Sequence, residues 1–212
     1  MDENKRETLL YIIGFIFLAI YIYVLILFIS CQYYLGLFWI CYLGILLFSI
    51  GIFLKNSDLV LSQVFLLLIP DILWGIDFFY RISFGNTLLG IDNFFFTTNY
   101  FSRKILSLQH LITPILGLSA LFLLKPKKFY KALIIGFVEI FLILLISLIF
   151  PFKEEINCLP TYKGCMFSDP SFLVPYPIFW LFVESLFILI SFVILYFIFN
   201  KKINKLSKKF IK

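Results

Sequence analysis

Ionisable side chains stand inside two apolar segments of the sequence, between Ile69 and Gly117. The first segment carries Asp71 and Asp77, and the second carries His110, the single histidine of the chain. A charged side chain near the centre of a bilayer costs about 2.5 kcal/mol or more, so such residues usually face the protein interior and serve a function. A histidine beside carboxylates indicates acid–base chemistry or proton transfer.

The polar residues of the first segment predict one polar face on a helix. At 100° per residue, five side chains fall within an arc of about 120°: Gln63, Asp71, Trp74, Asp77 and Arg81. Asp77 and Arg81 are four residues apart with the acid first, the favourable order for an ion pair within a helix. Asp71 lies about 9 Å from Asp77 along the axis and has no cation nearby in its own helix. It must therefore be protonated or paired through another helix.

The composition is that of an integral membrane protein. Of the 212 residues, 62% are hydrophobic and 14% are charged, whereas a soluble domain carries about 25% charged residues. The apolar runs are continuous, while the strands of a transmembrane barrel alternate in polarity. We therefore expect an all-α, polytopic transmembrane helix bundle that forms one domain over residues 1–212.

Six apolar segments have the length of a membrane-spanning helix. The predicted spans cover residues 9–30, 35–54, 59–80, 104–124, 130–150 and 174–200. An even number of spans puts both termini on one face, and most lysine and arginine residues fall on that same face. The positive-inside rule then predicts that both termini are cytoplasmic. We expect a multi-pass protein of the cytoplasmic (inner) membrane of a prokaryote.

Three connecting or terminal segments have distinct compositions. Residues 82–102 are rich in aromatic side chains and are predicted to lie in the membrane interface, or else to anchor helix ends as an aromatic belt. The outer loop, residues 151–173, contains Cys158 and Cys165, and the sequence leaves open whether these two residues form a disulfide. The basic tail, residues 201–212, predicts a short amphipathic helix on membrane lipids. Because the basic residues flank spans, no nucleic-acid partner is expected.

Two further carboxyl groups, Glu139 and Glu184, are predicted at membrane depth. Counted from the outer end of each span, Asp71, Glu139 and Glu184 lie about 13 to 17 Å deep, and His110 lies about 9 Å deep. These depths are compatible with one shared polar layer between spans three, four, five and six. Equally, Glu139 and Glu184 could each form a separate interhelical hydrogen bond.

The absence of several motifs excludes specific chemistries. One histidine is too few for bis-histidine haem or for a three-histidine zinc site, and no lysine lies inside a span, away from its ends, to form a retinal Schiff base. The sequence contains no G-x-S-x-G, P-loop or C-x-x-C motif. We expect no cofactor and no metal site.

Two functions and one structural role remain open. An intramembrane hydrolase or transferase could use His110 to activate Thr113, Ser107, Cys41 or water, with Asp71 or Asp77 orienting the ring. A small proton-coupled or cation transporter could use carboxylates near the midplane. A non-catalytic assembly subunit would use the same groups as hydrogen bonds between helices. The candidate residues for a substrate or ion pathway are Trp74, Arg81, Glu139, Glu184 and Asn157.

Four segments resemble a family of uncharacterised prokaryotic six-helix integral membrane proteins: ILWGIDFFYR, LLGIDNFFF, RKILSLQHLITP and EEIN. The resemblance covers about residues 69–157. It implies a six-helix fold without an assigned activity, and it carries six positions: Trp74, Asp77, Arg81, His110, Pro114 and Asn157. A fainter similarity, based on six helices with one intramembrane histidine, is to membrane hydrolases related to androgen-induced gene 1. The threonine of those enzymes has no clear counterpart in spans one and two.

Overall fold

The structure is a computed structural model that describes residues 2–30, 37–97, 101–126, 128–149 and 176–210. These residues form eight α-helices and no strand, which confirms the all-α prediction. The helices are α1 (Glu3–Ser30), α2 (Ile40–Phe53), α3 (Ser57–Phe84), α4 (Asn93–Thr97), α5 (Phe101–Ser107), α6 (Gln109–Leu124), α7 (Phe129–Ile149) and α8 (Tyr176–Phe210).

Five helical segments are long and apolar enough to cross a membrane: Glu3–Ser30, Ser57–Phe84, Lys104–Leu124, Phe129–Ile146 and Pro177–Phe199. The sixth apolar helix, α2, has 14 residues. At 1.5 Å per residue it is about 21 Å long, which is shorter than a hydrocarbon core of about 30 Å. The predicted second span, residues 35–54, therefore exceeds the helix at its N-terminal end, and residues 35 and 36 lie outside the described part.

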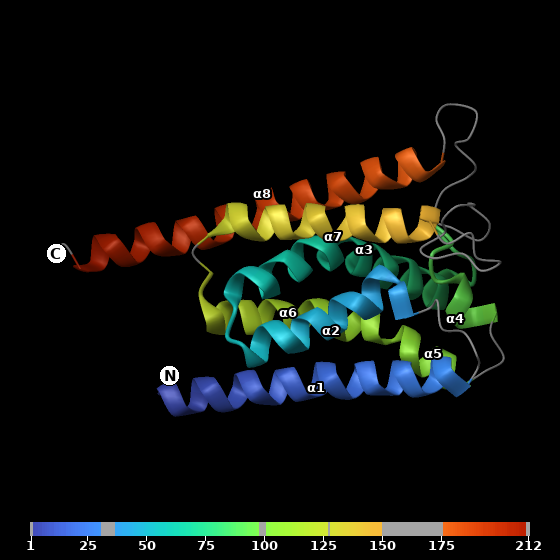
Figure 1. The fold of residues 1–212 in the computed structure, drawn as a ribbon, viewed down its shortest axis with the longest axis horizontal. Coiled ribbons are helices and arrows are strands. Elements are labelled where there is room, and N and C mark those ends of the chain that lie inside the picture. Colours follow the sequence, from blue (N-terminus) through green and yellow to red (C-terminus); the bar gives the residue numbers. More distant parts are fainter. Residues whose placement is uncertain (1, 31–36, 98–100, 127, 150–175, 211–212) are drawn as a thin grey trace.

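Helix α3 is the centre of the bundle (Figure 1). It packs against α2, α6, α7 and α8, while α1 packs on α2 and α6. The start of α1 and the end of α8 lie at one end of the bundle, and α4 and α5 lie at the other end. Polar residues on α3 can therefore meet side chains from four other helices.

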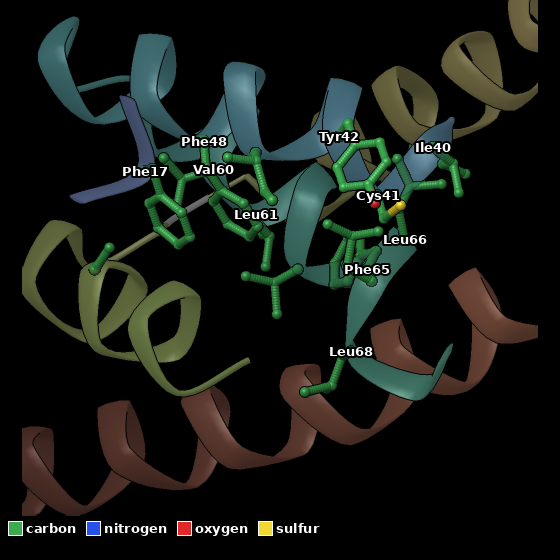
Figure 2. Close-up of a cluster of buried hydrophobic side chains, with 14 of the residues drawn as sticks. Phe17, Ile40, Cys41, Tyr42, Phe48, Val60, Leu61, Phe65, Leu66 and Leu68 are labelled. Carbon is green, nitrogen blue, oxygen red and sulfur yellow. The ribbon is translucent and has the colours of Figure 1, made fainter. Parts of the chain in front are cut away.

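The apolar core surrounds α3 and includes side chains of α1, α2, α6, α7 and α8; Figure 2 labels its members from α1, α2 and α3. Phe17 of α1 stacks on Phe48 of α2 with a distance of 4.8 Å between ring centroids, and both side chains are buried. Gly117 of α6 brings its backbone close to Phe48, because a Cβ atom there would lie 2.8 Å from the ring. In a bilayer, such close packing and small residues at helix contacts hold helices together, since lipid is as apolar as the core.

Capping residues define both ends of α3. The side chain of Asn56 accepts hydrogen bonds from the backbone N–H groups of Asp58 and Leu59, each 3.1 Å long. Gly85 ends the helix in the left-handed conformation, with a φ of 77°, and its N–H bonds to the carbonyl of Arg81. The helix is thus four residues longer at its C-terminal end than the predicted span, residues 59–80.

The basic tail was predicted as a short amphipathic helix, and residues 201–210 are helical in the structure as a continuation of α8. Helix α8 continues without interruption from Tyr176 to Phe210 and has 35 residues. No glycine or proline stands between residues 178 and 210, so nothing in the sequence breaks the series of backbone hydrogen bonds. The aromatic segment, residues 82–102, also contains the end of α3, helix α4 and the start of α5.

We expect Gly117→Leu to destabilise the bundle by about 1 to 3 kcal/mol, because the new side chain must displace the Phe48 ring. Thermal unfolding of the protein in detergent would measure this as a lower melting temperature. Ile115→Leu, on the same helix at a side chain that is 66% exposed, is the control and should leave the melting temperature unchanged.

Candidate active site

The His110 ring is bonded to Asp71 across the contact between α6 and α3. Its Nδ1 atom lies 2.6 Å from the Asp71 Oδ1 atom. Asp71 is 2% exposed, and its second oxygen has no hydrogen-bond partner among the described residues. Because a carboxylate accepts hydrogen bonds, Nδ1 carries the proton, and Nε2 is then the basic ring nitrogen. The structure thus pairs Asp71 through another helix.

A second polar residue, Gln109, supports the same ring. Its amide nitrogen lies 3.3 Å from Nδ1 and 3.2 Å from Nε2 of His110. A donor in the ring plane at such similar distances would collide with the carbon between the two nitrogens, so the amide lies over the ring face. The Thr113 hydroxyl donates a 3.0 Å hydrogen bond to the Gln109 oxygen and fixes the amide's orientation. The in-plane lone pair of Nε2 is therefore not occupied by this amide.

Trp74 of α3 also contacts the imidazole. The two ring centroids are 5.2 Å apart, and the planes are inclined by 30°. Trp74 in turn stacks on Phe78 with a centroid distance of 5.0 Å. The ring of His110 is thus held by a carboxylate, an amide and an aromatic side chain, which restricts its rotation.

The pair lines an open groove between α3 and α6 with a volume of about 600 Å³. This volume lies within the usual range of about 300 to 1,000 Å³ for ligand sites. The groove walls are mostly apolar, and Ile72, Ile76 and Phe79 on α3 are between 43% and 58% exposed. Pro114 lies on the α6 side and has no N–H to donate to the carbonyl of His110, one turn earlier.

A smaller groove of about 310 Å³ lies between α1 and the α5–α6 segment. Gln109 lines this second groove, whereas His110 lines the first. The two neighbouring residues thus face two different grooves, and only the larger one reaches the imidazole.

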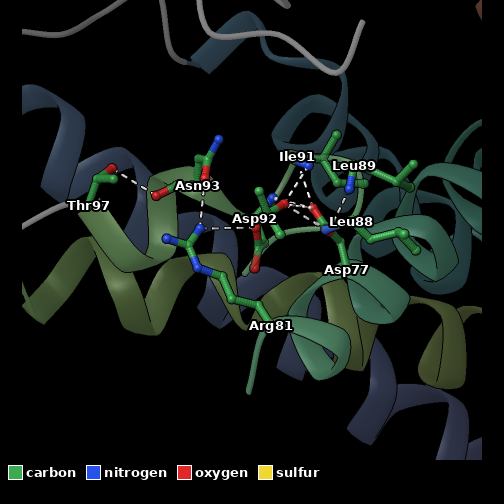
Figure 3. Close-up of polar contacts among 10 residues, drawn as sticks. Asp77, Arg81, Leu88, Leu89, Ile91, Asp92, Asn93 and Thr97 are labelled. Atoms are coloured by element: carbon green, nitrogen blue, oxygen red, sulfur yellow. Dashed lines mark hydrogen bonds and ion pairs between the residues drawn. The ribbon is translucent and has the colours of Figure 1, made fainter. Parts of the chain in front are cut away.

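Asp77 was expected as a partner of His110 or of Arg81, and the structure places it elsewhere. Its carboxylate accepts hydrogen bonds from the loop that follows α3, as Figure 3 shows for most of these contacts. The backbone N–H groups of Leu88 and Leu89 donate to Oδ1 at 2.7 and 2.8 Å. Further donors to the carboxylate are the Thr87 hydroxyl and the N–H groups of Ile91 and Asp92. Asp77 therefore holds residues 87–92 in place.

Arg81 contacts α4 and the residue before it. Its Nη1 atom lies 2.7 Å from the Asn93 side-chain oxygen and 3.4 Å from Asp92 (Figure 3). The guanidinium also lies over the Phe96 ring, 4.4 Å from its centroid. The expected pair with Asp77 does not form, because backbone amides already satisfy that carboxylate.

Burial raises the pKa of the Asp92 carboxyl, and the charge of Asp77 adds to this effect, while Arg81 opposes it. A raised pKa in an acid means that the folded loop binds the proton more tightly than the unfolded chain does. The charged form of Asp92 therefore destabilises the folded loop. The charged form of Asp77, in contrast, stabilises the loop by accepting its hydrogen bonds.

Among the described contacts, Glu139 and Glu184 do not bond to Asp71 or His110. Glu139 of α7 accepts a 2.8 Å hydrogen bond from the Gln63 amide, which lies eight residues, or about 12 Å along α3, from Asp71. Glu184 of α8 has a buried oxygen with no partner in the described part of the chain. The predicted single layer is thus divided, since Glu139 pairs at a different height.

Asn157, Cys158 and Cys165 lie outside the described residues. Within the described ranges, no three His, Cys, Asp or Glu side chains cluster as metal ligands. Thr113 is 1% exposed and donates to Gln109, so its hydroxyl does not point at the imidazole.

Sequence reasoning missed the roles of Gln109 and Thr87. Gln109 is adjacent to His110, and neighbouring residues on a helix point about 100° apart, which gave no reason to pair them. Thr87 stands in a turn between Gly85 and Gly90, both of which have positive φ angles. Those two glycines were the available signal that residues 85–90 fold into a compact turn.

Comparison with known proteins finds no protein family whose profile matches the chain, and no curated protein or solved structure that is similar to it.

Asp77→Asn should destabilise the loop, because the new amide group would face backbone donors that now bond to a carboxylate oxygen. Each lost hydrogen bond to a charged group contributes about 1.5 to 3 kcal/mol. We expect hydrogen–deuterium exchange at Leu88, Leu89 and Ile91 to accelerate by about 10- to 100-fold. Unchanged exchange would contradict the assigned role of Asp77.

Asp92→Asn is the matched control and should have the opposite outcome. Because the Asp92 pKa is raised, the neutral variant should protect the loop at least as well as the native residue at pH 8. This advantage should disappear as the pH falls through the raised pKa, where native Asp92 becomes neutral. Exchange rates measured at pH 4 and pH 8 test this sign.

Proposed function

We propose that the protein is an intramembrane enzyme, a hydrolase or a transferase, that acts on a lipid or lipid-like substrate. The observation that carries the proposal is the bond between Asp71 and His110 at the wall of a groove of about 600 Å³. A histidine with one nitrogen bound to a carboxylate and the other available is the arrangement of a general base. The groove's apolar walls suit a lipid substrate.

The chemistry follows from the two ring nitrogens. Nε2 of His110 takes a proton from water or from a substrate hydroxyl, and the oxygen attacks a carbonyl carbon of the substrate. Asp71 stabilises the imidazolium that forms. The proton then passes from Nε2 to the leaving oxygen as its bond to carbon breaks. Water gives a hydrolase, and a substrate hydroxyl gives a transferase.

The described side chains favour water or substrate as the nucleophile. The Thr113 hydroxyl is engaged with Gln109, and Cys41 is buried and free of disulfide bonds. Neither residue lines the groove. His110 is therefore proposed as the catalytic residue and Asp71 as its positioning residue, and Asp77 is assigned to the loop.

Purified protein in nanodiscs, incubated with a total lipid extract and followed by mass spectrometry, tests the proposal. Wild type should convert at least one lipid, and His110→Ala should lower turnover about 100-fold or more. Ser119→Ala is the control, because that hydroxyl bonds only to its own helix at the Ile115 carbonyl in the described structure. Full turnover in folded His110→Ala, or no lipid converted by wild type, would reject the enzyme.

Asp71→Asn separates positioning from folding. We expect this variant to lower kcat about tenfold or more and to leave KM unchanged, because the ring loses its orienting partner while the apolar walls remain. Asp71→Glu should restore part of kcat, since it keeps the carboxylate. Equal losses in Asn and Glu variants, together with a lower melting temperature, would instead indicate a structural role.

A proton-coupled or cation transporter is the second candidate. It is favoured by the buried carboxyl oxygens of Glu139 and Glu184 that lack partners among the described residues. Buried acids without partners at membrane depth are typical of proton pathways. Vesicles containing the protein should then show proton flux under a pH gradient, and Glu184→Gln should reduce it.

The proposal includes the membrane setting inferred from the sequence. We propose six spans in the cytoplasmic membrane of a prokaryote, with both termini on the cytoplasmic face. Two observations support this arrangement: the ends of the described chain lie at one end of the bundle, and α2 is apolar although short. Membrane lipids are the proposed partners.

A further inference from the structure

The bonded pair of Asp71 and His110 lies near the middle of α3, the helix that forms one wall of the groove. Asp71 is the fifteenth of the 28 residues of α3, so it is about 20 Å from either end of the helix. From Asp71 the groove extends along α3 as far as Phe84, at the C-terminal end of the helix. A substrate must therefore bring its reacting group about 20 Å below the helix end.

Among the described residues, the groove is lined by few polar side chains and by no lysine or arginine. Its described lining residues include the Asp71 carboxylate, the His110 imidazole and the hydroxyls of Tyr80 and Ser83, but no lysine and no arginine. The remaining lining residues are apolar or glycine. An anionic headgroup in this groove would find no counterion and would face the carboxylate of Asp71.

The cations nearest to the groove in sequence have other contacts. Arg81 of α3 is bonded to Asn93 and Asp92 and lies over the Phe96 ring. Lys104 of α5 lies 6.0 Å from the centroid of the Phe95 ring. Neither side chain lines the groove. To bind a phosphate, Arg81 would have to give up its bonds at the base of α4.

These observations limit the substrate by charge. Moving an ionised group into a region of low dielectric is very unfavourable unless it is paired. A weakly polar group such as an ester or an alcohol needs only one or two hydrogen bonds, which the imidazole and the hydroxyls can supply. The lining of the groove therefore favours a neutral polar group over an ionised one.

We infer that the groove between α3 and α6 binds a neutral lipid with an ester or alcohol group and no charged headgroup. This inference rests on the proposed enzyme and names its substrate class. The hydrocarbon chain lies along α3 between Ile72 and Phe84, and the polar group meets His110.

Two photoreactive probes with the same chain test the charge preference. One is a diazirine-bearing long-chain alcohol, and the other is its phosphate monoester. In phosphatidylcholine nanodiscs, the alcohol should label residues 71–84 saturably, and the phosphate should need at least a tenfold higher concentration. Equal or stronger saturable labelling by the phosphate, or no saturable labelling by the alcohol, would overturn the inference.

Two filling variants locate the bound probe. Gly75→Leu should abolish saturable labelling, since its side chain enters the groove beside the flexible Leu111 side chain. Ala19→Leu makes the same kind of change in the smaller groove and should leave labelling unchanged. If Gly75→Leu fails to fold, Ile76→Trp, at a 49% exposed position in the groove, replaces it. Labelling that survives both groove variants would contradict the site.

Adding a cation should reverse the preference. Ile76→Lys places a positive charge in the groove about 8 Å along α3 from Asp71, at a side chain that is 49% exposed. We expect the phosphate probe to bind this variant at least tenfold more tightly than it binds wild type. If the variant binds the phosphate probe no more tightly than wild type does, the lack of a cation is not what weakens phosphate binding, and the inference is contradicted.

The outcomes separate this inference from the enzyme proposal. If His110→Ala loses turnover and the converted lipid is anionic, the charge inference fails and the enzyme stands. If wild type converts no lipid, the enzyme fails, and the labelling experiment still decides which charge the groove accepts.

Discussion

The bond between Asp71 and His110 is the contact on which the site depends. A carboxylate near the middle of a buried helix needs a hydrogen-bond donor, and the nearest cation in α3, Arg81, is engaged by α4. The donor comes from α6, so the site exists only while α3 and α6 lie side by side. Gln109 and Trp74 then restrict the same ring from two further directions. Packing and chemistry are thereby linked, because separating these two helices would remove both.

Two aspartates six residues apart on one helix have different tasks in this structure. Asp71 faces a histidine, while Asp77 faces a row of backbone N–H groups. Both lie on the polar face that helical spacing predicts, and spacing alone cannot tell which neighbour each residue meets. The deciding information is in the connection after α3, where Gly85 and Gly90 adopt positive φ angles and bring the loop back over Asp77. Turn geometry of this kind depends on tertiary contacts, which an i to i+4 rule does not include.

The sequence was informative where membrane physics is strict. Long apolar runs must be helical because lipid satisfies no backbone groups, and α1, α3, α7 and α8 contain the corresponding predicted spans apart from their ends. Prediction was weaker where helix ends depend on capping or on its absence. Helix α3 continues past Tyr80 until Gly85 ends it, and α8 continues past Asn200 because no glycine or proline there ends it. Depth counted from such uncertain ends placed Glu139 level with Asp71, whereas its partner is Gln63.

The separation in sequence between each aspartate and its partners has a consequence for synthesis. The donors to Asp77 follow within 15 residues, so this carboxylate can be satisfied soon after α3 leaves the ribosome. The partner of Asp71, His110, is 39 residues later in the chain and is therefore synthesised later. Until α6 has been inserted, the nascent chain holds an uncompensated polar group at the centre of α3. Insertion of α6 therefore supplies the hydrogen-bond donor that the Asp71 carboxylate needs at the centre of α3.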